Sequence, residues 1–440
     1  MVVPSLGRRA AILLTIPLWA IAFLPAPARA VTLDPRSPVS PPNAWTAGNA
    51  LGRTQTFLQT AWASDCPPPS GACATDSGPY MGVFWQRGLL ATPLAWRKPV
   101  RISRRRQQSS RPALAAAVND VYVAWVTRPS YLHPRASDPR VLWIRASRDS
   151  GRTWGSAHRM SRLRGRVDFP VIAASGSRAW LVWTNANTGE IRLSTTIDDG
   201  ANWPTTTIGT TTAGAGTAAG FRGFPAVGAS GANLVVVWIA DDSGRLVALT
   251  SSTGGSEWTS SSTPVGLLAS GPHGPSDYPA ARGADDGSST NVAIAYATSD
   301  GVEARLFDGV TLGPPSTVKG PWPVSIGGVR YDGGYGPSVA AFGPDGIAVA
   351  WAGCRHVSSL ADPCSGDSSR ARIDGLERES SDGGSTWHPV SSVAVARSGA
   401  GISEALSLEA DGTGARWLVW LSRSASWSTY RVFGRTGTAP

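Results

Sequence analysis

Short runs of apolar and β-branched residues alternate along the chain with stretches rich in Gly, Pro, Ser and Thr. The runs at 121–126 and 234–239 are six residues long and contain only aliphatic and aromatic side chains. Runs of this length and composition are typical of strands that are buried on both faces. The pattern therefore predicts an all-β protein made of many short strands.

A pair of strands recurs seven times, twice in a looser form. The first strand often follows an aromatic-Pro or Gly-Pro step, and the second strand ends in an aromatic residue. These aromatic markers lie 55 to 69 residues apart, at Trp62, Trp125, Trp183, Trp238, Tyr296, Trp351 and Trp420. A near-regular period of this size is typical of a β-propeller. We predict seven four-stranded blades, with six or eight blades as alternatives.

Each repeat has room for four strands, which we name A to D from the inside outward. In the second repeat, strands A, B and C are expected around 112–117, 121–126 and 141–146, with strand D after Trp154. The last repeat ends after its third strand. We expect the N-terminal stretch around 43–45 to supply its missing outer strand, which would close the ring and remove an exposed sheet edge.

The turn between strands C and D carries the most specific motif. It is SRDSGRTW at 147–154, TIDDGANW at 196–203 and SSDGGSTW at 380–387, and a degenerate copy at 251–258 has Thr253 in place of Asp. The Asp carboxylate can accept bonds from its own turn, the Gly tolerates positive φ, and the Trp buries a large surface. We therefore interpret the motif residues as structural rather than catalytic: Asp149, Gly151, Trp154, Asp198, Gly200, Trp203, Asp382, Gly384 and Trp387.

This motif resembles the Asp-box, or BNR repeat, of the sialidase-like propeller superfamily. The resemblance implies a propeller whose Asp-boxes lie on the face opposite the active site. It also implies, for sialidases, three arginines on the substrate carboxylate, a Tyr nucleophile activated by Glu, and an Asp acid/base. Two departures argue against sialidase activity. The F/Y-R-I-P motif of the first arginine is missing, with 221–225 as the nearest stretch, and sialidases typically have six blades.

Four residues near the starts of inner strands form a possible glycosidase constellation. Tyr335 and Glu404 are candidates for a nucleophile and its base, and Asp168 and Asp277 are candidates for the acid. The alternative is that the aromatic-Pro steps nearby, at 169–170, 224–225 and 278–279, simply plug the inner strands.

The loops predict which face binds ligands. B–C loops are long in the first, second and sixth repeats, around 64–81, 127–140 and 353–371, and these repeats lie together in a seven-membered ring. Arginines fill the neighbouring D–A loops, and arginine forks suit carboxylate and phosphate groups. The candidate ligand-binding residues are Arg104, Arg105, Arg106, Arg162, Arg164, Arg166 and Arg330.

Four cysteines form two local pairs within long loops. We predict the disulfides Cys66–Cys73 and Cys354–Cys364, because the chain is expected to be exported. Neither spacing suits zinc, and no other motif indicates a metal or cofactor.

Residues 1–30 are predicted to be a signal peptide, with Arg8 and Arg9 before an apolar run and Ala28-Arg29-Ala30 at its end. An uncleaved N-terminal anchor is the alternative. The remainder, 31–440, is expected to be a single propeller domain without a membrane span. The net charge is +10, and only two of the 40 basic residues are lysines. A basic surface favours anionic partners, although arginine bias alone does not indicate nucleic-acid binding.

These observations predict a secreted or extracytoplasmic monomer that recognises an anionic extracellular glycan, or a protein. An exo-acting glycoside hydrolase of sialidase type and an assembly scaffold at the cell envelope are the alternatives.

Overall fold

The computed structural model is built from strands and turns throughout the residues that it describes. None of these residues forms a helix with the length and apolar character that a membrane crossing needs. The described residues are 37–38, 46–64, 81–90, 95–104, 107–128, 139–162, 165–212, 223–259, 263–267, 278–284, 289–298, 301–357, 372–394, 401–423 and 430–437.

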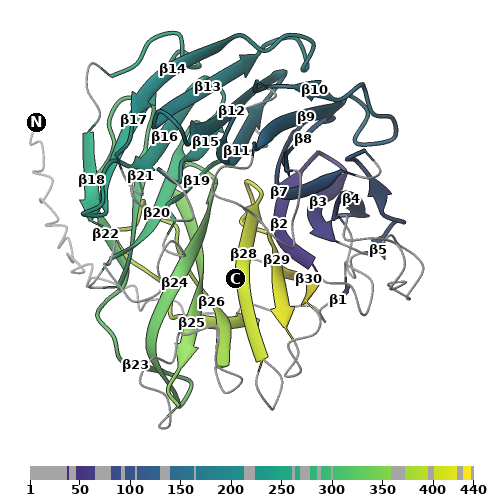
Figure 1. The fold of residues 1–440 in the computed structure, drawn as a ribbon. Coiled ribbons are helices and arrows are strands. Elements are labelled where there is room, and N and C mark those ends of the chain that lie inside the picture. Colours follow the sequence, from purple (N-terminus) through teal and green to yellow (C-terminus); the bar gives the residue numbers. More distant parts are fainter. Residues whose placement is uncertain are drawn as a thin grey trace, which may run out of the picture.

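The strands follow the predicted repeat and form blades around a common axis (Figure 1). Blade 1 contains β2 (Thr46–Arg53), β3 (Phe57–Ser64), β4 (Gly82–Leu89), β5 (Ala95–Trp96) and β6 (Val100–Arg101). Blade 2 contains β7 (Gln108–Ala117), β8 (Asp120–Arg128), β9 (Val141–Ser147) and β10 (His158–Arg159). Blade 3 contains β11 (Val167–Ser175), β12 (Arg178–Asn185), β13 (Glu190–Thr196) and β14 (Thr205–Thr210). Blade 4 contains β15 (Ala226–Ser230), β16 (Asn233–Ile239), β17 (Arg245–Ser251) and β18 (Thr263–Leu267).

The remaining strands form three further repeat units. Blade 5 contains β19 (Ala280–Gly283), β20 (Val292–Thr298), β21 (Gly301–Phe307) and β22 (Ser316–Lys319). Blade 6 contains β23 (Val324–Ile326), β24 (Val329–Phe342), β25 (Gly346–Arg355), β26 (Arg372–Ser380) and β27 (Ser391–Ala394). Blade 7 contains β28 (Gly401–Ala410), β29 (Arg416–Arg423), β30 (Tyr430–Gly437) and β1 (Ser37–Pro38).

The sheets number six although the repeat units number seven. A short parallel pairing between β26 and β28, at Ile373 and Ile402, merges blades 6 and 7 into one nine-stranded sheet. The innermost strands nevertheless contact one another in a closed ring, which runs through β2, β7, β11, β15, β19, β24 and β28 and returns to β2. The all-β propeller predicted from the sequence is confirmed.

The ring closes through a strand from the N-terminal part of the chain. β1 pairs antiparallel with β30, with Ser37 opposite Gly434 and Pro38 opposite Phe433. The prediction that this part of the chain completes the last blade is therefore correct, but the predicted position was wrong. The strand lies at 37–38 rather than 43–45, and residues 39–45 lie outside the described part of the chain.

The hydrophobic core is divided among the seams between neighbouring blades. Seven apolar clusters each join two adjacent blades, and the aromatic marker of every repeat packs toward the blade before it. Trp183 of β12, for example, lies in one cluster with Tyr122 and Leu142 of blade 2. Burying large aromatic surfaces at these seams supplies much of the driving force for folding.

The three complete Asp-boxes have one hydrogen-bond pattern. In the first, Asp149 Oδ1 accepts the Thr153 N–H at 2.8 Å, and Oδ2 accepts the Thr153 hydroxyl at 2.7 Å. Ser147 donates to Asp149 at 2.8 Å while its hydroxyl accepts the N–H of Gly151. The oxygens of the Asp149 carboxylate are thus bonded within their own turn.

Each box also fastens its blade to the preceding one. The Trp154 ring packs edge-on against Trp85 of blade 1, with centroids 5.2 Å apart, and Trp203 packs the same way on Tyr122 of blade 2. Gly151 has a φ of 80°, and a Cβ there would overlap the Trp85 ring. The glycine is thus required both by its conformation and by the neighbouring blade.

Hydrogen bonds within the box lower the pKa of its aspartates. The Thr386 hydroxyl and N–H, with Ser380, hold the pKa of Asp382 at about 2. A carboxyl whose pKa falls on folding stabilises the protein above the unfolded pKa, and that contribution is lost as pH falls toward the folded value. Acid below about pH 4 therefore weakens the boxes.

We expect Asp149→Ala to lower the free energy of unfolding by about 1–2 kcal/mol, because it leaves turn donors without an acceptor. In the degenerate box, Thr253 Oγ1 accepts the Glu257 N–H at 2.9 Å. A threonine has a single side-chain oxygen, so it cannot supply the second acceptor that an aspartate provides. Thr253→Asp is therefore expected to raise stability. Thermal and urea melts test both variants, and an unchanged Asp149→Ala melt would contradict the structural role.

Asp120, which is outside the Asp-boxes, lies in the seam between blades 2 and 3 close to Asp199. Burial and the neighbouring Asp199 carboxylate raise the pKa of Asp120 to about 6. Between about pH 4 and pH 6 the unfolded chain ionises this group while the folded chain keeps it protonated, so stability falls as pH rises through that window.

Asp120→Asn should therefore raise the free energy of unfolding by roughly 1–3 kcal/mol at pH 7 and leave it unchanged at pH 3.5. Urea melts at the two pH values measure this difference. Asp199→Asn is the matched variant, because it removes the other carboxylate of the pair. The free energy of unfolding of the double variant should differ little from that of either single variant. An equal effect at both pH values would mean that charge is not the cause.

Candidate functional site

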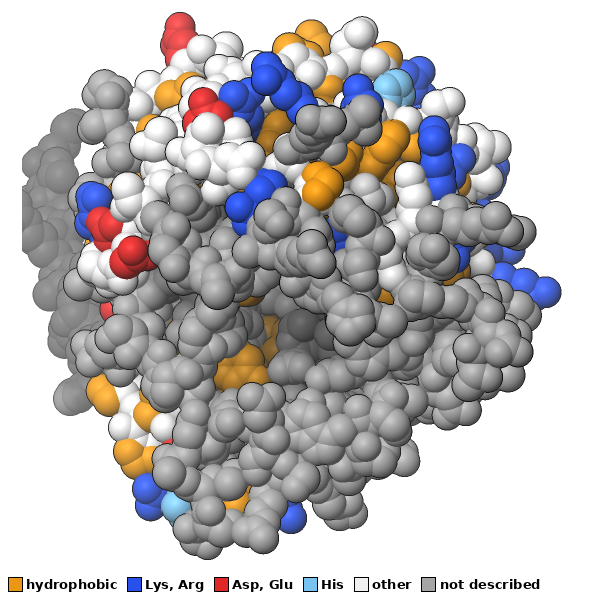
Figure 2. Space-filling model, viewed as in Figure 1, with side chains coloured by type: hydrophobic (Ala, Val, Ile, Leu, Met, Phe, Trp, Pro, Cys, Tyr) orange, Lys and Arg blue, Asp and Glu red, His pale blue; other side chains and the backbone are white. Residues whose placement is uncertain are grey.

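Two faces of the ring carry different loops. The Asp-box turns lie at the ends of the C strands, and the D–A and B–C loops lie at the opposite ends of the strands, which we call the loop face. Figure 2 shows the ring hollowed at its centre, with hydrophobic side chains visible inside the hollow.

The inner strands share a bend near their first residues, at the loop face. The residue before Pro has positive φ in four blades, at Arg111 (53°), Phe169 (44°), Phe224 (37°) and Gly336 (59°). Register shifts mark β-bulges here in blades 2, 3 and 6. Bulges re-aim side chains, and non-Gly residues persist at such φ values only when their surroundings hold them.

The aromatic residues at these bends pack on one another. The ring centroids of Phe169 and Phe224 are 4.1 Å apart, and those of Phe224 and Tyr278 are 4.4 Å apart. The Arg111 guanidinium lies 4.3 Å from the Phe169 centroid. Four neighbouring blades are thereby joined at their inner ends, which agrees with the interpretation of these steps as a plug.

The candidate nucleophile Tyr335 is a core residue of β24. Its side chain is 7% exposed and packs with Cys354, Ile373 and Leu406 in the seam between blades 6 and 7. Glu404 lies in β28, but its side chain is outside the described part of the structure, as are the side chain of Asp168 and the whole of Asp277. Tyr335 is thus the one member of the predicted constellation whose side chain is described, and the constellation stays a prediction.

Blade 6 instead holds a buried polar group. The Tyr331 hydroxyl donates to Asp374 Oδ2 at 2.8 Å, and Arg355 Nε donates to the same oxygen at 2.5 Å. Burial and the Asp374 carboxylate raise the pKa of Tyr331. Tyr331 and Asp374 are almost fully buried. Because they are closed off and bonded to each other, they serve to hold the strands rather than to reach a substrate.

A cavity of about 640 Å³ lies in the seam between blades 2 and 3. One wall is the segment from Met160 to Val167, which leads from β10 to β11, and the other is formed by the end of β12 and the start of β13. The outer strand β10 has two residues, whereas β14 has six.

The cavity is lined by arginines and hydrogen-bonding groups. Its side chains include Arg162, Arg166, Trp183, Asn185, Asn187, Thr188, Glu190 and Arg192. Glu190 Oε2 accepts bonds from Arg192 Nη2 and the Thr188 hydroxyl, both at 2.9 Å. These bonds lower the pKa of Glu190, so it is a carboxylate at neutral pH and not a general acid.

Arg166 differs from Arg192 in having no counter-ion among the described residues. Its Nε and Nη2 atoms are shielded from solvent and have no hydrogen-bond acceptor in the part of the chain that the structure describes. The Arg166 backbone is bonded to both blades. Its C=O accepts the Ala186 N–H of blade 3 at 2.8 Å, and it forms an isolated β-bridge with Arg140 of blade 2. Arg166 thus lines the cavity, but its Nε and Nη2 atoms are buried away from solvent.

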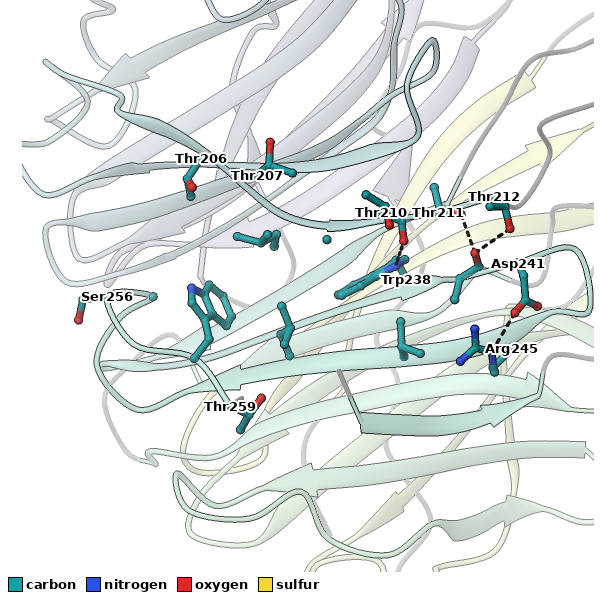
Figure 3. A pocket seen from close by; sticks show the side chains of 17 residues that line it. Thr206, Thr207, Thr210, Thr211, Thr212, Trp238, Asp241, Arg245, Ser256 and Thr259 are labelled. Carbon is teal, nitrogen blue, oxygen red and sulfur yellow. Dashed lines mark hydrogen bonds and ion pairs between the residues drawn. The ribbon is translucent and has the colours of Figure 1, made fainter. Parts of the chain in front are cut away.

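The corresponding seam between blades 3 and 4 contains a groove of about 780 Å³ with different chemistry (Figure 3). β14 contributes threonines, and the opposite wall contains Trp238, Val247 and Leu249. Arg245 and Asp241 pair with each other at 2.9 Å. Trp238 donates its indole N–H to the Thr210 C=O at 3.1 Å, whereas Trp183, at the same place in blade 3, makes no such bond with a described residue.

The other predicted ligand residues are spread over the ring. Arg104 lies over the Trp143 ring at 5.4 Å, near the seam of blades 1 and 2. Arg330 is exposed on blade 6 and pairs with Asp332 at 2.7 Å. Arg105, Arg106 and Arg164 lie outside the described residues. Of the predicted arginines, the structure thus brings Arg162 and Arg166 together.

The predicted disulfides remain predictions. Cys354 is buried and is not a free thiol, but Cys66, Cys73 and Cys364 lie outside the described residues. Within the described part of the chain, no three His, Cys, Asp or Glu side chains are grouped to hold a metal ion.

Sequence analysis missed Glu190, Arg192 and Trp183 as parts of a site. A signal was present in β13, where the polar residues Glu190 and Arg192 alternate with the buried residues Ile191 and Leu193. Residues two apart share one face of a strand, so the polar face of β13 could have been assigned to a seam.

Comparisons with known proteins give similarity of fold alone. No family model and no curated protein matches the sequence. A mutant of NanB sialidase from Streptococcus pneumoniae is 8% identical over 72% of this chain and 67% of its own, with a TM-score of 0.47. A Trypanosoma rangeli sialidase mutant displaying trans-sialidase activity is 10% identical over 92% of this chain and 60% of its own, with a TM-score of 0.49.

A protein of unknown function from Dyadobacter fermentans is 13% identical over 74% of this chain and 97% of its own, with a TM-score of 0.47. Identities this low and TM-scores below 0.5 say nothing about activity. The strand topology shows a β-propeller, and three of its C–D turns share the Asp-box hydrogen bonds.

We expect Arg166→Met to raise the free energy of unfolding by about 1–2 kcal/mol in the absence of ligand, because it removes a shielded charge without an acceptor. Arg162→Met is the control, since Arg162 is exposed and such changes stay within about 0.5 kcal/mol. Urea melts measure both. A loss of stability in Arg166→Met would show that Arg166 holds the seam together.

Proposed function

We propose that the protein is an extracellular recognition protein that binds an anionic glycan on the loop face of its propeller. The observation that carries this proposal is the cavity between blades 2 and 3, where Arg162, Arg166 and Arg192 line one space with a single carboxylate, Glu190. Arginine surplus in a concave, polar site favours an anionic ligand.

Binding is favoured over hydrolysis by the state of the titratable groups. Tyr335 packs in a core, and Tyr331 is bonded to a buried carboxylate. Glu190 is kept ionised by its partners. None of these groups is poised to donate a proton to a leaving group. The signal peptide predicted at 1–30 supports a location outside the cytoplasm, where acidic glycans are available ligands.

The test is a calorimetric titration of the purified protein with matched acidic and neutral oligosaccharides. We expect the acidic member to bind, and raising salt from about 50 mM to about 500 mM to weaken it roughly tenfold, because exposed charges are screened. Arg162→Ser should weaken binding further. The triple variant Arg104→Ser, Arg105→Ser, Arg106→Ser measures how much the remaining basic loops contribute.

Preference for the neutral sugar, or indifference to salt, would contradict anionic recognition. Release of reducing sugar during the titration would favour the glycoside hydrolase. Binding of envelope proteins without any glycan binding would favour the scaffold.

A further inference from the structure

We infer that the outer edge of blades 1 and 2 is a docking surface for a linear acidic polysaccharide, which continues along this edge from the cavity between blades 2 and 3. This inference rests on the proposed function and specifies that its ligand is a chain rather than a single sugar. The surface is made of exposed cations and lies outside the central hollow of the ring.

Charge is distributed unevenly around the ring. Residues 46–162, which form blades 1 and 2, contain 17 Lys and Arg against five Asp and Glu, whereas residues 163–440 contain 19 against 24. In Figure 2, Lys and Arg side chains gather toward the upper right, where blades 1 and 2 lie, and Asp and Glu side chains are visible at the upper left. A molecule polarised in this way turns its basic side toward a polyanion.

The exposed cations of blades 1 and 2 lack acidic neighbours. Six of them, which we call the basic edge, make no ion pair with a described residue: Arg97, Lys98, Arg104, Arg152, Arg159 and Arg162. The described acids of the two blades are Asp120 and Asp149, and Asp149 is bonded within its own turn. By contrast, Arg245 of blade 4 is paired with Asp241. The cations of the basic edge are therefore available to an anionic ligand.

The basic edge is continuous across the seam between the two blades. Arg104, after the outer strand of blade 1, lies over the Trp143 ring of blade 2 at 5.4 Å, and Arg159 of β10 is opposite Trp143 in strand pairing. Arg145 of β9 also joins the blades, since its Nη1 donates to the Ile102 C=O of blade 1 at 3.4 Å. Directly paired residues share one face of a sheet, so both exposed arginines lie beside Trp143.

Three cations of the basic edge follow the outer side of blade 2 from one face of the ring to the other. Arg152 lies in the Asp-box turn, Arg159 in β10, and Arg162 at the loop-face end, where it lines the cavity of the proposed site. β10 is the outermost strand of its sheet. A chain with one acidic unit in the cavity can therefore continue along β10 and place further acidic units beside Arg159 and Arg152.

The composition of the basic edge favours a polysaccharide over a membrane. Binding to a membrane surface combines cations with apolar side chains that enter the lipid. The most exposed large apolar side chains among the described residues, Ile197 and Val310, belong to blades 3 and 5. Five of the six cations are arginines, whose forks pair with the oxygens of acidic groups. The basic edge therefore matches the repeated acidic groups of a polysaccharide.

The experiment measures binding of the full protein to dextran sulfate, to unsulfated dextran of the same length, and to a sulfated disaccharide. We expect the sulfated chain to bind roughly tenfold or more tightly than the disaccharide, because several contacts act together, and unsulfated dextran not to bind. The logarithm of the chain affinity should fall with the logarithm of salt concentration with a slope of about 3 or more, since each contact releases counterions.

A triple variant of the basic edge locates the contact. Arg97→Ser, Lys98→Ser and Arg159→Ser together should weaken chain binding about tenfold and lower the salt slope by about 2–3. Affinity for the sulfated disaccharide should not change, because these three residues do not line the cavity. Arg97→Lys with Arg159→Lys keeps the charge and should bind the chain like the unaltered protein. Melting curves confirm that each variant is folded.

A second triple variant removes the same charge elsewhere. Arg178→Ser, Arg245→Ser and Arg372→Ser replace exposed arginines of blades 3, 4 and 6. Chain affinity should change by less than about threefold, because charges far from the contact are screened by salt. The comparison of the two triple variants separates a localised surface from attraction by net charge.

Several outcomes would overturn the inference. Equal loss of chain binding in both triple variants would mean that net charge attracts the chain, and a chain that binds no tighter than the disaccharide would confine the ligand to the cavity. In both cases acidic-glycan binding would still stand. Tighter binding to phosphatidylserine vesicles than to dextran sulfate would make the basic edge a membrane contact. Failure of every acidic sugar, short or long, would remove the proposed function as well.

Discussion

The structure depends on the packing of each blade against the one before it. Every repeat places a large aromatic residue at the end of its second strand, and that residue is buried in the seam with the preceding blade. In four repeats the Trp of the C–D turn adds to the same seam, as Trp154 does on Trp85. No blade has a hydrophobic core of its own. The stability of the molecule is therefore the sum of the packing energies of neighbouring blade pairs around a closed ring.

This arrangement leaves the loops and the outer strands free to vary. The seam between blades 3 and 4, beside the six-residue strand β14, contains a groove lined by threonines and apolar side chains. The seam between blades 2 and 3, beside the two-residue strand β10, contains a cavity lined by polar side chains of the next blade. Binding chemistry can therefore be introduced at a seam without disturbing the aromatic packing beneath it.

The fold was largely predictable because its signals are local. The aromatic markers and the motifs around Asp149, Asp198 and Asp382 repeat at near-regular spacing, and each acts within its own turn or on the adjacent blade. The details that sequence missed are non-local. The closing strand at 37–38 and the pairing of β26 with β28 depend on partners far away in the chain or on their exact register.

The site was predictable only in part for the same reason. Arginine-rich D–A loops pointed to Arg162 and Arg166, but nothing in the local sequence showed that Arg192 would be neutralised by Glu190 while Arg166 would not. Tyr335 had the right neighbours in sequence for a nucleophile, yet its position on β24 directs it into a seam core. Whether a side chain faces a core or a cavity is decided by the adjacent blade.

The pairing of β1 with β30 also determines when the molecule can become complete. The two partners are made at opposite ends of synthesis, and the segment that carries β1 must wait while blades 1 to 6 form and stack in order. Until β28 and β29 emerge, the apolar flanks of blades 1 and 6 have no neighbour to cover them. A growing chain of this kind is therefore exposed to aggregation until its last strands arrive, and it would benefit from a chaperone that shields those two flanks.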